Sequence, residues 1–286
     1  MRRLIFSDLD GTFLDHHTYD ERPALSTLLV ALQQGIPCIW NTSKTLPEVL
    51  EFRQQLCEKL MLAGGEPSLI QASLKTPFII ENGAAIYLPD GGLIQDTSLP
   101  RIQGYRIKTF APSRNQVLEV LSCVRAGYHY RGFADMTLED LIAATGLAPH
   151  RAHMAATRGF TEPVLWQDAP EALHRFTHTL NQLGLRCVLG GRFLHISGYH
   201  DKGKALRWLT LHYEALAPDT PIETIALGDG RNDIPMLEQA DIAVAIPSAS
   251  GSRLNLQTPG RVIRPEQPGP RGWAEAMQHL LETRHE

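Results

Sequence analysis

The 286-residue sequence predicts an α/β protein in which a parallel sheet covered by helices is interrupted by an inserted α+β domain. Three observations support this fold class. Apolar strand-like runs alternate with helical patterns up to about residue 85, the alternation is lost between residues 86 and 198, and it returns from residue 199 onward. We therefore expect a parallel domain built from residues 1–85 and 199–286, with an inserted domain at residues 86–198.

The first part of the chain is predicted to form three strands separated by two helices. The strands are expected at Arg3–Phe6, Ile36–Trp40 and Pro77–Ile80, and the helices at Pro23–Gln34 and Pro47–Leu60. In the first helix, apolar residues such as Leu25, Leu28 and Leu32 recur at helical spacing, and Gly35 then ends the pattern. Strands that alternate with helices favour a parallel sheet, because each helix carries the chain back to the edge where the next strand starts.

The middle of the chain mixes strand and helix patterns without this alternation. Ile86–Ile94 has the pattern of a hairpin around Asp90-Gly91-Gly92. Helices are expected at Asn115–Val124, Thr137–Ala144 and Ala169–Leu183, and strands at Arg186–Leu189 and Arg192–Ser197. This mixture is typical of an α+β domain with an antiparallel sheet.

The alternation of strands and helices returns after Gly198. Helices are expected at Lys204–Leu216, Asn232–Gln239 and Trp273–Leu281, and strands at Ile222–Leu227 and Ile242–Ile246. Sequence rich in proline and glycine, Pro259–Gly272, precedes the last helix. The pattern matches that of the first part of the chain, so both parts are expected to build the same sheet.

Composition and charge exclude several classes of protein. Hydrophobic residues make up 43% of the chain, which is enough for a sizeable core. The net charge of −4 argues against a nucleic-acid or anionic-membrane partner, since both require clustered Lys and Arg. No apolar stretch reaches the ~18 residues of a membrane span. The four cysteines are scattered, as is usual in a reducing compartment. We expect a cytoplasmic protein that acts on a small molecule.

Polar side chains follow three of the strands expected in the parallel domain, at the point where each strand ends. The three segments are Ser7–Thr12, Asn41–Lys44 and Gly228–Asp233, and Lys202 opens the helix before the last of them. In open α/β sheets, ligands bind beyond the carboxyl ends of the strands. The sequence therefore predicts one site built from these distant segments.

Four carboxylates converge on this predicted site, namely Asp8, Asp10, Asp229 and Asp233. Two such charges 4 Å apart repel by ~4 kcal/mol at an effective dielectric constant of about 20. A fold retains such a cluster when a cation lies among the carboxylates. An all-oxygen ligand set without Cys or His favours Mg²⁺ over zinc, and a magnesium ion with open positions favours a phosphate ligand.

The Asp-x-Asp spacing of Asp8 and Asp10 predicts a reactive pair. In an extended segment, residues i and i+2 project to the same side, so both carboxylates can flank one reacting atom. One of them can attack phosphorus as a nucleophile, and the other can protonate the leaving oxygen and then accept a proton from water. Thr42 offers a hydroxyl group and Lys202 a cation to the phosphoryl oxygens.

These residues resemble the four motifs of haloacid-dehalogenase phosphatases. Asp8-Leu9-Asp10-Gly11-Thr12 resembles the first motif, Thr42 the second, Lys202 the third and the segment Gly228–Asp233 the fourth. The order and spacing are similar to the subgroup with a large cap between the second and third motifs. The resemblance implies a Rossmann-like parallel-sheet core with an inserted C2-type α+β cap.

The resemblance also implies a role for each core residue. Asp8 would be the nucleophile and Asp10 the acid/base. Asp8, the Asp10 carbonyl and Asp229 would bind magnesium with support from Asp233. Thr42 and Lys202 would hold the phosphoryl group.

A narrower resemblance is to the mannosyl-3-phosphoglycerate phosphatase family. It rests on Asn41–Thr45, Glu81–Ala84, Thr161–Pro163, Gly191–His195 and Gly269–Trp273. The resemblance implies a glycosyl-3-phosphoglycerate substrate and, as product, the compatible solute mannosylglycerate or its glucosyl relative. The residues expected to contact substrate are Ser43, Lys44, Arg158, Glu162, Arg192, His195 and Asn232. A planar Arg side chain suits a carboxylate such as that of glycerate.

Other interpretations stay open at this point. Gly198–Lys204 matches most of a nucleotide-binding P-loop, but Ala205 stands where that motif requires Ser or Thr for magnesium. The same core could also serve a general sugar-phosphate phosphatase, a phosphomutase-like enzyme or a glucosyl-3-phosphoglycerate phosphatase. A catalytically silent binding or regulatory module that keeps the acidic site is the alternative from another class.

Overall fold

The computed structural model describes residues 2–190, 192–248, 251, 253–258 and 260–282, which form two compact units. Unit 1 comprises Met1–Thr42, Arg53–Lys108 and Asp201–Glu286, and unit 2 comprises Ser43–Phe52 and Thr109–His200. These units differ from the expected boundaries in two places. Residues 86–108 belong to unit 1 because their strands pair with a strand that precedes them. Residues 43–52 belong to unit 2, where the Thr45 hydroxyl donates to the Met154 carbonyl.

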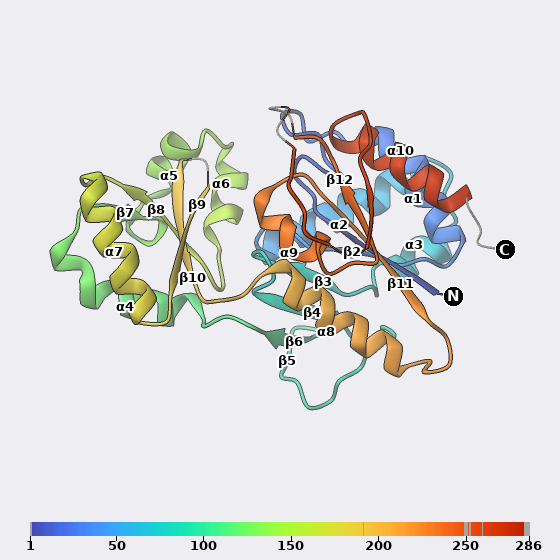
Figure 1. Ribbon diagram of the computed structural model, residues 1–286, viewed down its shortest axis with the longest axis horizontal. Helices are drawn as coiled ribbons and strands as arrows, with labels where there is room; N and C mark the ends of the chain where they lie inside the picture. The colour runs from blue at the N-terminus through green and yellow to red at the C-terminus, as the bar shows by residue number, and fades with distance from the viewer. Residues whose placement is uncertain (1, 191, 249–250, 252, 259, 283–286) are drawn as a thin grey trace. The chain divides into compact units, whose positions relative to one another are not determined.

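Unit 1 is built on a five-stranded parallel sheet in the order β13-β12-β11-β1-β2 (Figure 1). The strands are β1 (Arg2–Ser7), β2 (Cys38–Trp40), β11 (Ile222–Gly228), β12 (Ile242–Ala245) and β13 (Arg261–Ile263). β1 lies between β11 and β2, with Ser7 opposite both Leu227 and Trp40. The parallel sheet expected from both ends of the chain is confirmed, and its central strands are the buried apolar runs.

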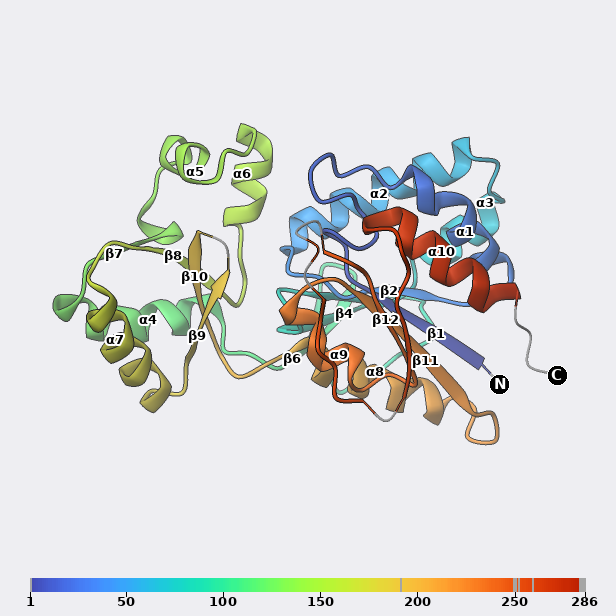
Figure 2. The same cartoon turned by 45° about the horizontal axis from the view of Figure 1, so that its top comes forward.

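Helices cover both faces of this sheet (Figure 2). On one face, α1 (Arg22–Gln33) packs against α10 (Gly269–Glu282); on the other, α8 (Lys202–Ala215) packs against α9 (Ile234–Leu237). A proline in the first turn starts α1, and its leucines at helical spacing are buried against the sheet. The predicted helix Asn232–Gln239 forms instead as a 3₁₀ turn, Arg231–Asp233, followed by the short α9.

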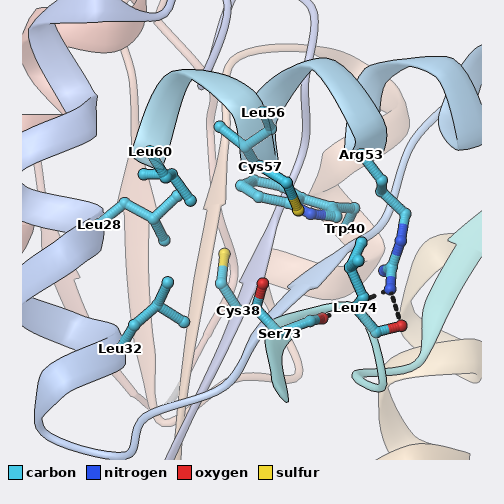
Figure 3. Close-up of a pocket in the computed structure, with 10 residues that line it drawn as sticks. All are labelled: Leu28, Leu32, Cys38, Trp40, Arg53, Leu56, Cys57, Leu60, Ser73 and Leu74. Atoms are coloured by element: carbon cyan, nitrogen blue, oxygen red, sulfur yellow. Dashed lines mark hydrogen bonds between the residues drawn. The ribbon is translucent and has the colours of Figure 1, made fainter. Parts of the chain in front are cut away.

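Two further helices follow β2, the first of which begins in unit 2 and continues into unit 1. α2 (Leu46–Leu62) precedes α3 (Pro67–Ser73). Side chains of α1 and α2 lie beside Cys38 and Trp40 of β2 in Figure 3. They line a small cavity, of about 20 Å³. At its edge, the buried guanidinium of Arg53 donates to the carbonyls of Thr76 and Leu74, and burial lowers the pKa of Arg53 to about 10. Arg53 thereby holds the chain that leaves α3 and enters the next strand.

The predicted third parallel strand, Pro77–Ile80, belongs to a second sheet instead. This sheet has the order β3-β4-β6-β5, with β3 (Phe78–Ile80), β4 (Ala85–Pro89), β5 (Arg101–Ile102) and β6 (Tyr105–Thr109). β3 pairs antiparallel with β4, and a single parallel bridge, Asn41↔Ile79, links it to the chain after β2. The expected hairpin Ile86–Ile94 is also wrong, since the neighbours of β4 are β3 and β6. Apolar runs predict strands, but they do not specify partners.

Unit 2 is an α+β domain with an antiparallel sheet in the order β7-β8-β10-β9, as expected. Its strands are β7 (Tyr130–Gly132), β8 (Glu162–Trp166), β9 (Arg186–Gly190) and β10 (Phe193–Ser197). Its helices are α4 (Arg114–Val124), α5 (Leu138–Thr145), α6 (Pro149–Ala156) and α7 (Pro170–Gln182). The main core forms between α4, α7 and the sheet, with Val117, Phe176 and Leu194 buried in it. None of the helices described in either unit is both long and apolar enough to cross a membrane.

Candidate catalytic and metal site

Two neighbouring strands of the parallel sheet deliver the acidic residues. Asp8 follows β1 and Asp229 follows β11, and these strands run side by side in the same direction. The 3₁₀ turn after β11 brings back Asp233, whose Oδ2 accepts hydrogen bonds from the backbone N–H groups of Asp229 and Gly230. One carboxylate oxygen from each of Asp8, Asp229 and Asp233 lies within 4.8 Å of the other two. Aspartates far apart in sequence thus form one cluster.

Lys202 lies inside this cluster. Its Nζ is 2.6 Å from Oδ1 of Asp8 and 2.5 Å from Oδ1 of Asp233, and its side chain is fully buried. The Lys202 carbonyl accepts a hydrogen bond from the Asn41 side chain, which ties the start of α8 to the end of β2. Asp201 caps α8 through the Lys204 N–H. A carboxylate therefore occupies the helix N-terminus where a P-loop would bind phosphate, which disfavours the nucleotide-binding interpretation.

Burial and mutual repulsion shift the acidity of the cluster. Burial, followed by the charge of Asp233, raises the pKa of Asp8 from 3.8 to about 7, against the opposing effect of Lys202. Burial and the charge of Asp8 raise the pKa of Asp229 to about 6, and burial raises the pKa of Asp233. Burial lowers the pKa of Lys202, but the charges of Asp233 and Asp8 outweigh this, so its pKa is raised.

The charge balance of the cluster fits a divalent cation. Three ionised carboxylates and one ammonium leave a net charge of −2, and the carboxylate oxygens close to one another are hard ligands. Burial is the main cause of the raised pKa values of Asp8 and Asp229, and the negative charge of the neighbouring aspartates adds to it. A doubly charged ion beside Asp8 and Asp229 would neutralise it.

The turn after β1 is shaped to pack against Asp229. Gly11 has a φ of +82°, and a Cβ at this position would lie 2.4 Å from Oδ2 of Asp229, so glycine is required on both counts. The buried Thr12 donates from Oγ1 to Oδ1 of Asp229 over 3.1 Å. Asp10 lies in the same turn, close enough for its charge to raise the pKa of Asp8. The first and fourth motifs therefore meet.

A strained turn after β3 contacts the remaining core residues. Glu81, Asn82 and Gly83 all have positive φ values, of 46°, 60° and 90°, which is costly for the two non-glycine residues. The Asn82 N–H donates to the Thr42 carbonyl, and its side-chain oxygen accepts from Nδ2 of Asn232. The buried Thr42 and the exposed Asn232, both predicted from sequence, are thus connected through Asn82.

Comparison with known proteins identifies the family. Residues 192–256 match a family model described as haloacid dehalogenase-like hydrolase. A relative from Persephonella marina, named glucosyl-3-phosphoglycerate/mannosyl-3-phosphoglycerate phosphatase, is 32% identical over 97% of both chains. The chain belongs to the haloacid dehalogenase-like hydrolase family.

Solved structures agree with this hydrolase in fold. A protein from Thermoplasma acidophilum aligns with a TM-score of 0.63 at 17% identity, covering 99% of each chain. A haloacid dehalogenase-like hydrolase from Bacteroides thetaiotaomicron aligns with a TM-score of 0.62 at 16% identity, covering 98% of this chain and all of that one. At these identities the likeness establishes the fold, and it confirms the expected combination of parallel-sheet core and α+β cap.

Three of the residues predicted to contact substrate lie together in unit 2 of the hydrolase. Arg158 donates to the Ser43 carbonyl over 3.1 Å and also to the Thr161 hydroxyl. His195, on β10, is close enough to Arg158 that burial and the charge of Arg158 lower the pKa of His195 to about 4. His195 is therefore a neutral imidazole at physiological pH. Lys44 follows Ser43 directly in the chain.

Glu162 and Arg192 are placed differently from these three residues. Glu162 is buried in a salt bridge with Arg114, 2.6 Å long, and its second oxygen accepts from the Ala134 N–H. This geometry favours a role for Glu162 in holding unit 2 together rather than in binding a ligand. Arg192 is exposed, and its guanidinium donates to the Thr145 carbonyl.

The sequence motifs gave no role to Thr12, and they placed Asn82 in a turn, with contact to a ligand as the alternative. Thr12 follows the Asp-x-Asp-Gly run, where its hydroxyl reaches Asp229 from more than 200 positions away in the chain. Asn82 precedes Gly83 in a sequence that is typical of a left-handed turn. The turn was predictable, but its contact with Asn232 was not, because it depends on how the two sheets of unit 1 meet.

Proposed function

We propose that this hydrolase is a magnesium-dependent phosphatase that hydrolyses a glycosyl-3-phosphoglycerate, yielding mannosylglycerate or its glucosyl relative and inorganic phosphate. The observation that carries the proposal is the cluster of Asp8, Asp229 and Asp233 around the buried Lys202. It combines a nucleophile, a site of net negative charge for a divalent ion and a fixed cation for phosphoryl oxygens.

The proposed reaction has two steps. In the first, a carboxylate oxygen of Asp8 attacks phosphorus, the bond from phosphorus to the glycerate oxygen breaks, and Asp10 gives its proton to that oxygen. In the second, Asp10 takes a proton from water, the water oxygen attacks the phosphorus of the Asp8 acyl phosphate, and phosphate leaves with Asp8 restored. Lys202 and Thr42 hold the phosphoryl oxygens in both steps.

The metal fits the residues that surround Asp8. Asp8, the Asp10 carbonyl and Asp229 would hold Mg²⁺, and Asp233 would support them by orienting Lys202 and the backbone of Asp229. When bound, Mg²⁺ supplies positive charge against the phosphoryl oxygens. It would also offset the burial and repulsion that raise the pKa of Asp8, so that Asp8 is ionised and nucleophilic at neutral pH.

Two observations support the proposed substrate class. The Persephonella marina relative carries both glucosyl- and mannosyl-3-phosphoglycerate in its name. In unit 2, the neutral His195 beside Arg158 offers a hydrogen-bonding group next to a cation, which suits sugar hydroxyls and a glycerate carboxylate. Ser43, Lys44, Arg158, Arg192 and His195 are the proposed substrate contacts, together with Asn232.

A substrate panel tests the proposal directly. The purified protein is incubated with Mg²⁺ and mannosyl-3-phosphoglycerate, glucosyl-3-phosphoglycerate, hexose 6-phosphates or p-nitrophenyl phosphate, and released phosphate is measured. We expect kcat/KM for one or both glycosyl-3-phosphoglycerates to exceed that for the hexose phosphates by about 100-fold, which corresponds to a transition-state difference of about 2.7 kcal/mol. Equal values across the panel would indicate a broad sugar-phosphate phosphatase.

Metal dependence is tested by chelation. Activity is measured after exhaustive dialysis against EDTA and again after Mg²⁺ is restored. We expect activity to be lost and then recovered. Full activity without metal would contradict the proposed site.

No phosphate release from any ester, together with failure to bind beryllium fluoride with Mg²⁺, would favour a silent binding module over an enzyme.

A further inference from the structure

We propose that Trp273 is a positioning residue for catalysis, which holds the turn carrying Asp8 and Asp10 through the hydroxyl group of Ser7. This inference rests on the proposed function, because it concerns the geometry of the proposed nucleophile. Trp273 lies in the first turns of α10, at the opposite end of the sequence from Asp8, and its side chain is fully buried.

A directed pair of hydrogen bonds connects Trp273 to Asp8. Nε1 of Trp273 donates to Oγ of Ser7 over 3.0 Å, and Oγ of Ser7 donates to the Asp8 carbonyl over 2.8 Å. An indole N–H is only a donor, so the Ser7 oxygen must be the acceptor and its own proton is free to bond the carbonyl. Ser7 and Trp273 are both fully buried, so water does not compete for these bonds.

Trp273 also contacts the far side of the same turn. Its ring meets the ring of Phe13 edge-on, with centroids 5.2 Å apart and an interplanar angle of 84°. Phe13 in turn lies against Trp40 of β2, with centroids 4.7 Å apart. The segment between Ser7 and Phe13 is therefore held at both ends by one side chain, through a hydrogen bond before Asp8 and an aromatic contact after Gly11.

The start of α10 lies beside this turn. A Cβ on Gly269 would lie 3.7 Å from Cα of Asp15 and 3.9 Å from the Gly11 carbonyl oxygen. A Cβ on Gly272 would lie 1.9 Å from the Gln267 carbonyl oxygen, so the residue before Trp273 has to be glycine. Trp273 therefore follows a glycine with no room for a side chain, in a helix whose start lies close to the turn.

These hydrogen bonds affect the orientation of Asp8 more than the stability of the fold. The hydrogen bond from Ser7 to the Asp8 carbonyl fixes the plane of the peptide between Asp8 and Leu9. We infer that it thereby also fixes the direction in which the Asp8 side chain points toward Lys202. An apolar residue could fill the buried position of Ser7 in β1, but it would leave this peptide plane unspecified. A misplacement of about 1 Å at a reacting group costs up to about 100-fold in rate.

The test uses Trp273→Phe, which keeps an aromatic ring beside Phe13 and removes the N–H, and Ser7→Ala, which removes the hydroxyl. With Mg²⁺ and the best ester of the substrate panel, we expect each variant to lower kcat about tenfold and to leave KM within about twofold. The double variant is expected to lose about tenfold as well, not about 100-fold, because both changes break one chain of bonds. Ser7→Thr, which retains a hydroxyl, should recover most of the loss.

Trp208→Phe is the matched control, since it removes an indole from α8, where the ring stacks on His212. It should leave kcat unchanged. Wild-type kcat in both Trp273→Phe and Ser7→Ala would overturn the inference, and so would a lower melting temperature with no change in kcat per folded molecule. Multiplicative losses in the double variant would also overturn it.

A second readout needs neither substrate nor metal. Hydrogen exchange of the backbone amides of residues 9–14 is compared between wild type and Trp273→Phe. We expect faster exchange in this turn and unchanged exchange in β11; unchanged exchange in the turn would contradict the inference. If the wild type hydrolyses no ester, the proposed function fails, whereas the exchange experiment still decides whether Trp273 holds the turn.

Discussion

Lys202 illustrates how single residues create the chemistry of this protein. Its ammonium group is fully buried between Asp8 and Asp233, which is tolerable only because both carboxylates bond it. Asp229 adds a further negative charge within 4.8 Å of both aspartates. Lys202 is therefore held by two carboxylates, and the site still has a net negative charge. The sequence predicted that these aspartates lie together, because they follow parallel strands whose carboxyl ends meet at one edge of the sheet.

The substitution Asp8→Asn removes the proposed nucleophile with little change in shape. We expect it to lower kcat by roughly 10³-fold or more, as loss of a covalent nucleophile does in other enzymes. Circular dichroism should remain that of the wild type. Substantial turnover by the folded variant would show that Asp8 does not attack phosphorus. Asp96→Asn, in an exposed loop of unit 1, is the matched control and should retain full activity.

The metal-free protein should lose stability as the pH rises. The folded pKa values of Asp8 and Asp229, about 7 and about 6, lie above the unfolded value of 3.8. Between these limits the folded protein binds more protons than the unfolded chain, so the free energy of unfolding falls as the pH rises through 6 and 7. With EDTA present, the melting temperature is expected to fall between about pH 4 and about pH 7, and less steeply in Asp8→Asn. Parallel curves for the two proteins would contradict this pKa assignment.

At the scale of elements, the turn after β3 connects parts of unit 1 that the sequence does not bring together. It bonds the chain after β2 through Thr42 and the turn after β11 through Asn232. Gly83 lets the turn approach the start of α8, since a Cβ there would lie 2.1 Å from the Asp201 carbonyl oxygen. Three left-handed residues in succession are thus held in place by contacts on several sides.

Gly83→Ala should therefore disturb both stability and activity. We expect a loss of about 3 kcal/mol in the free energy of unfolding, together with a lower kcat because Lys202 follows Asp201 directly. Gly64→Ala is the matched control, since Gly64 also has a positive φ, of 85°, but open space around its Cβ position. Urea unfolding of both variants measures the difference. Equal destabilisation would mean that backbone strain alone, and not the contact with Asp201, explains the effect.

Elements were easier to predict than their pairing. The amphipathic helix α1 and the buried run of β1 follow from hydrophobic periodicity. The helix α6 was missed because Ala152 and Met154 are its only buried residues, so its sequence lacks an apolar stripe. β3 was assigned to the parallel sheet because a short apolar run is equally suited to either sheet. The strand β13, within proline- and glycine-rich sequence, carried no signal at all.

For the molecule as a whole, the proposed division of labour is between two units. Unit 1 contains the groups proposed to act on any phosphate ester, and unit 2 contains most of the residues proposed to recognise a particular ester. The sequence predicted that an insertion exists, but the ends of the units are set by contacts: residues 86–108 follow β3 into unit 1. The ion pair between Glu162 and Arg114 could not be predicted from the sequence, because the two residues lie 48 positions apart in the chain.

Arg192→Ala tests this division. We expect KM for glycosyl-3-phosphoglycerate to rise about tenfold while kcat changes by less than about twofold, because binding that is equal in ground and transition states affects KM alone. The kinetics for p-nitrophenyl phosphate, which has no glycerate, should be unchanged. Arg175→Ala removes the same charge from an exposed position on α7 and serves as the control. An equal effect of Arg192→Ala on both esters would argue against selective recognition of the glycerate.

The central place of β1 has a consequence for the synthesis of the protein. β1 is translated well before its neighbour β11, which begins at Ile222. At about 5–20 residues per second, the roughly 220 intervening residues take about 10–45 s to translate. Throughout this time Asp8 lacks Lys202, Asp229 and the indole of Trp273 as partners. The proposed nucleophile therefore has no active site around it until α8, β11 and α10 have been translated.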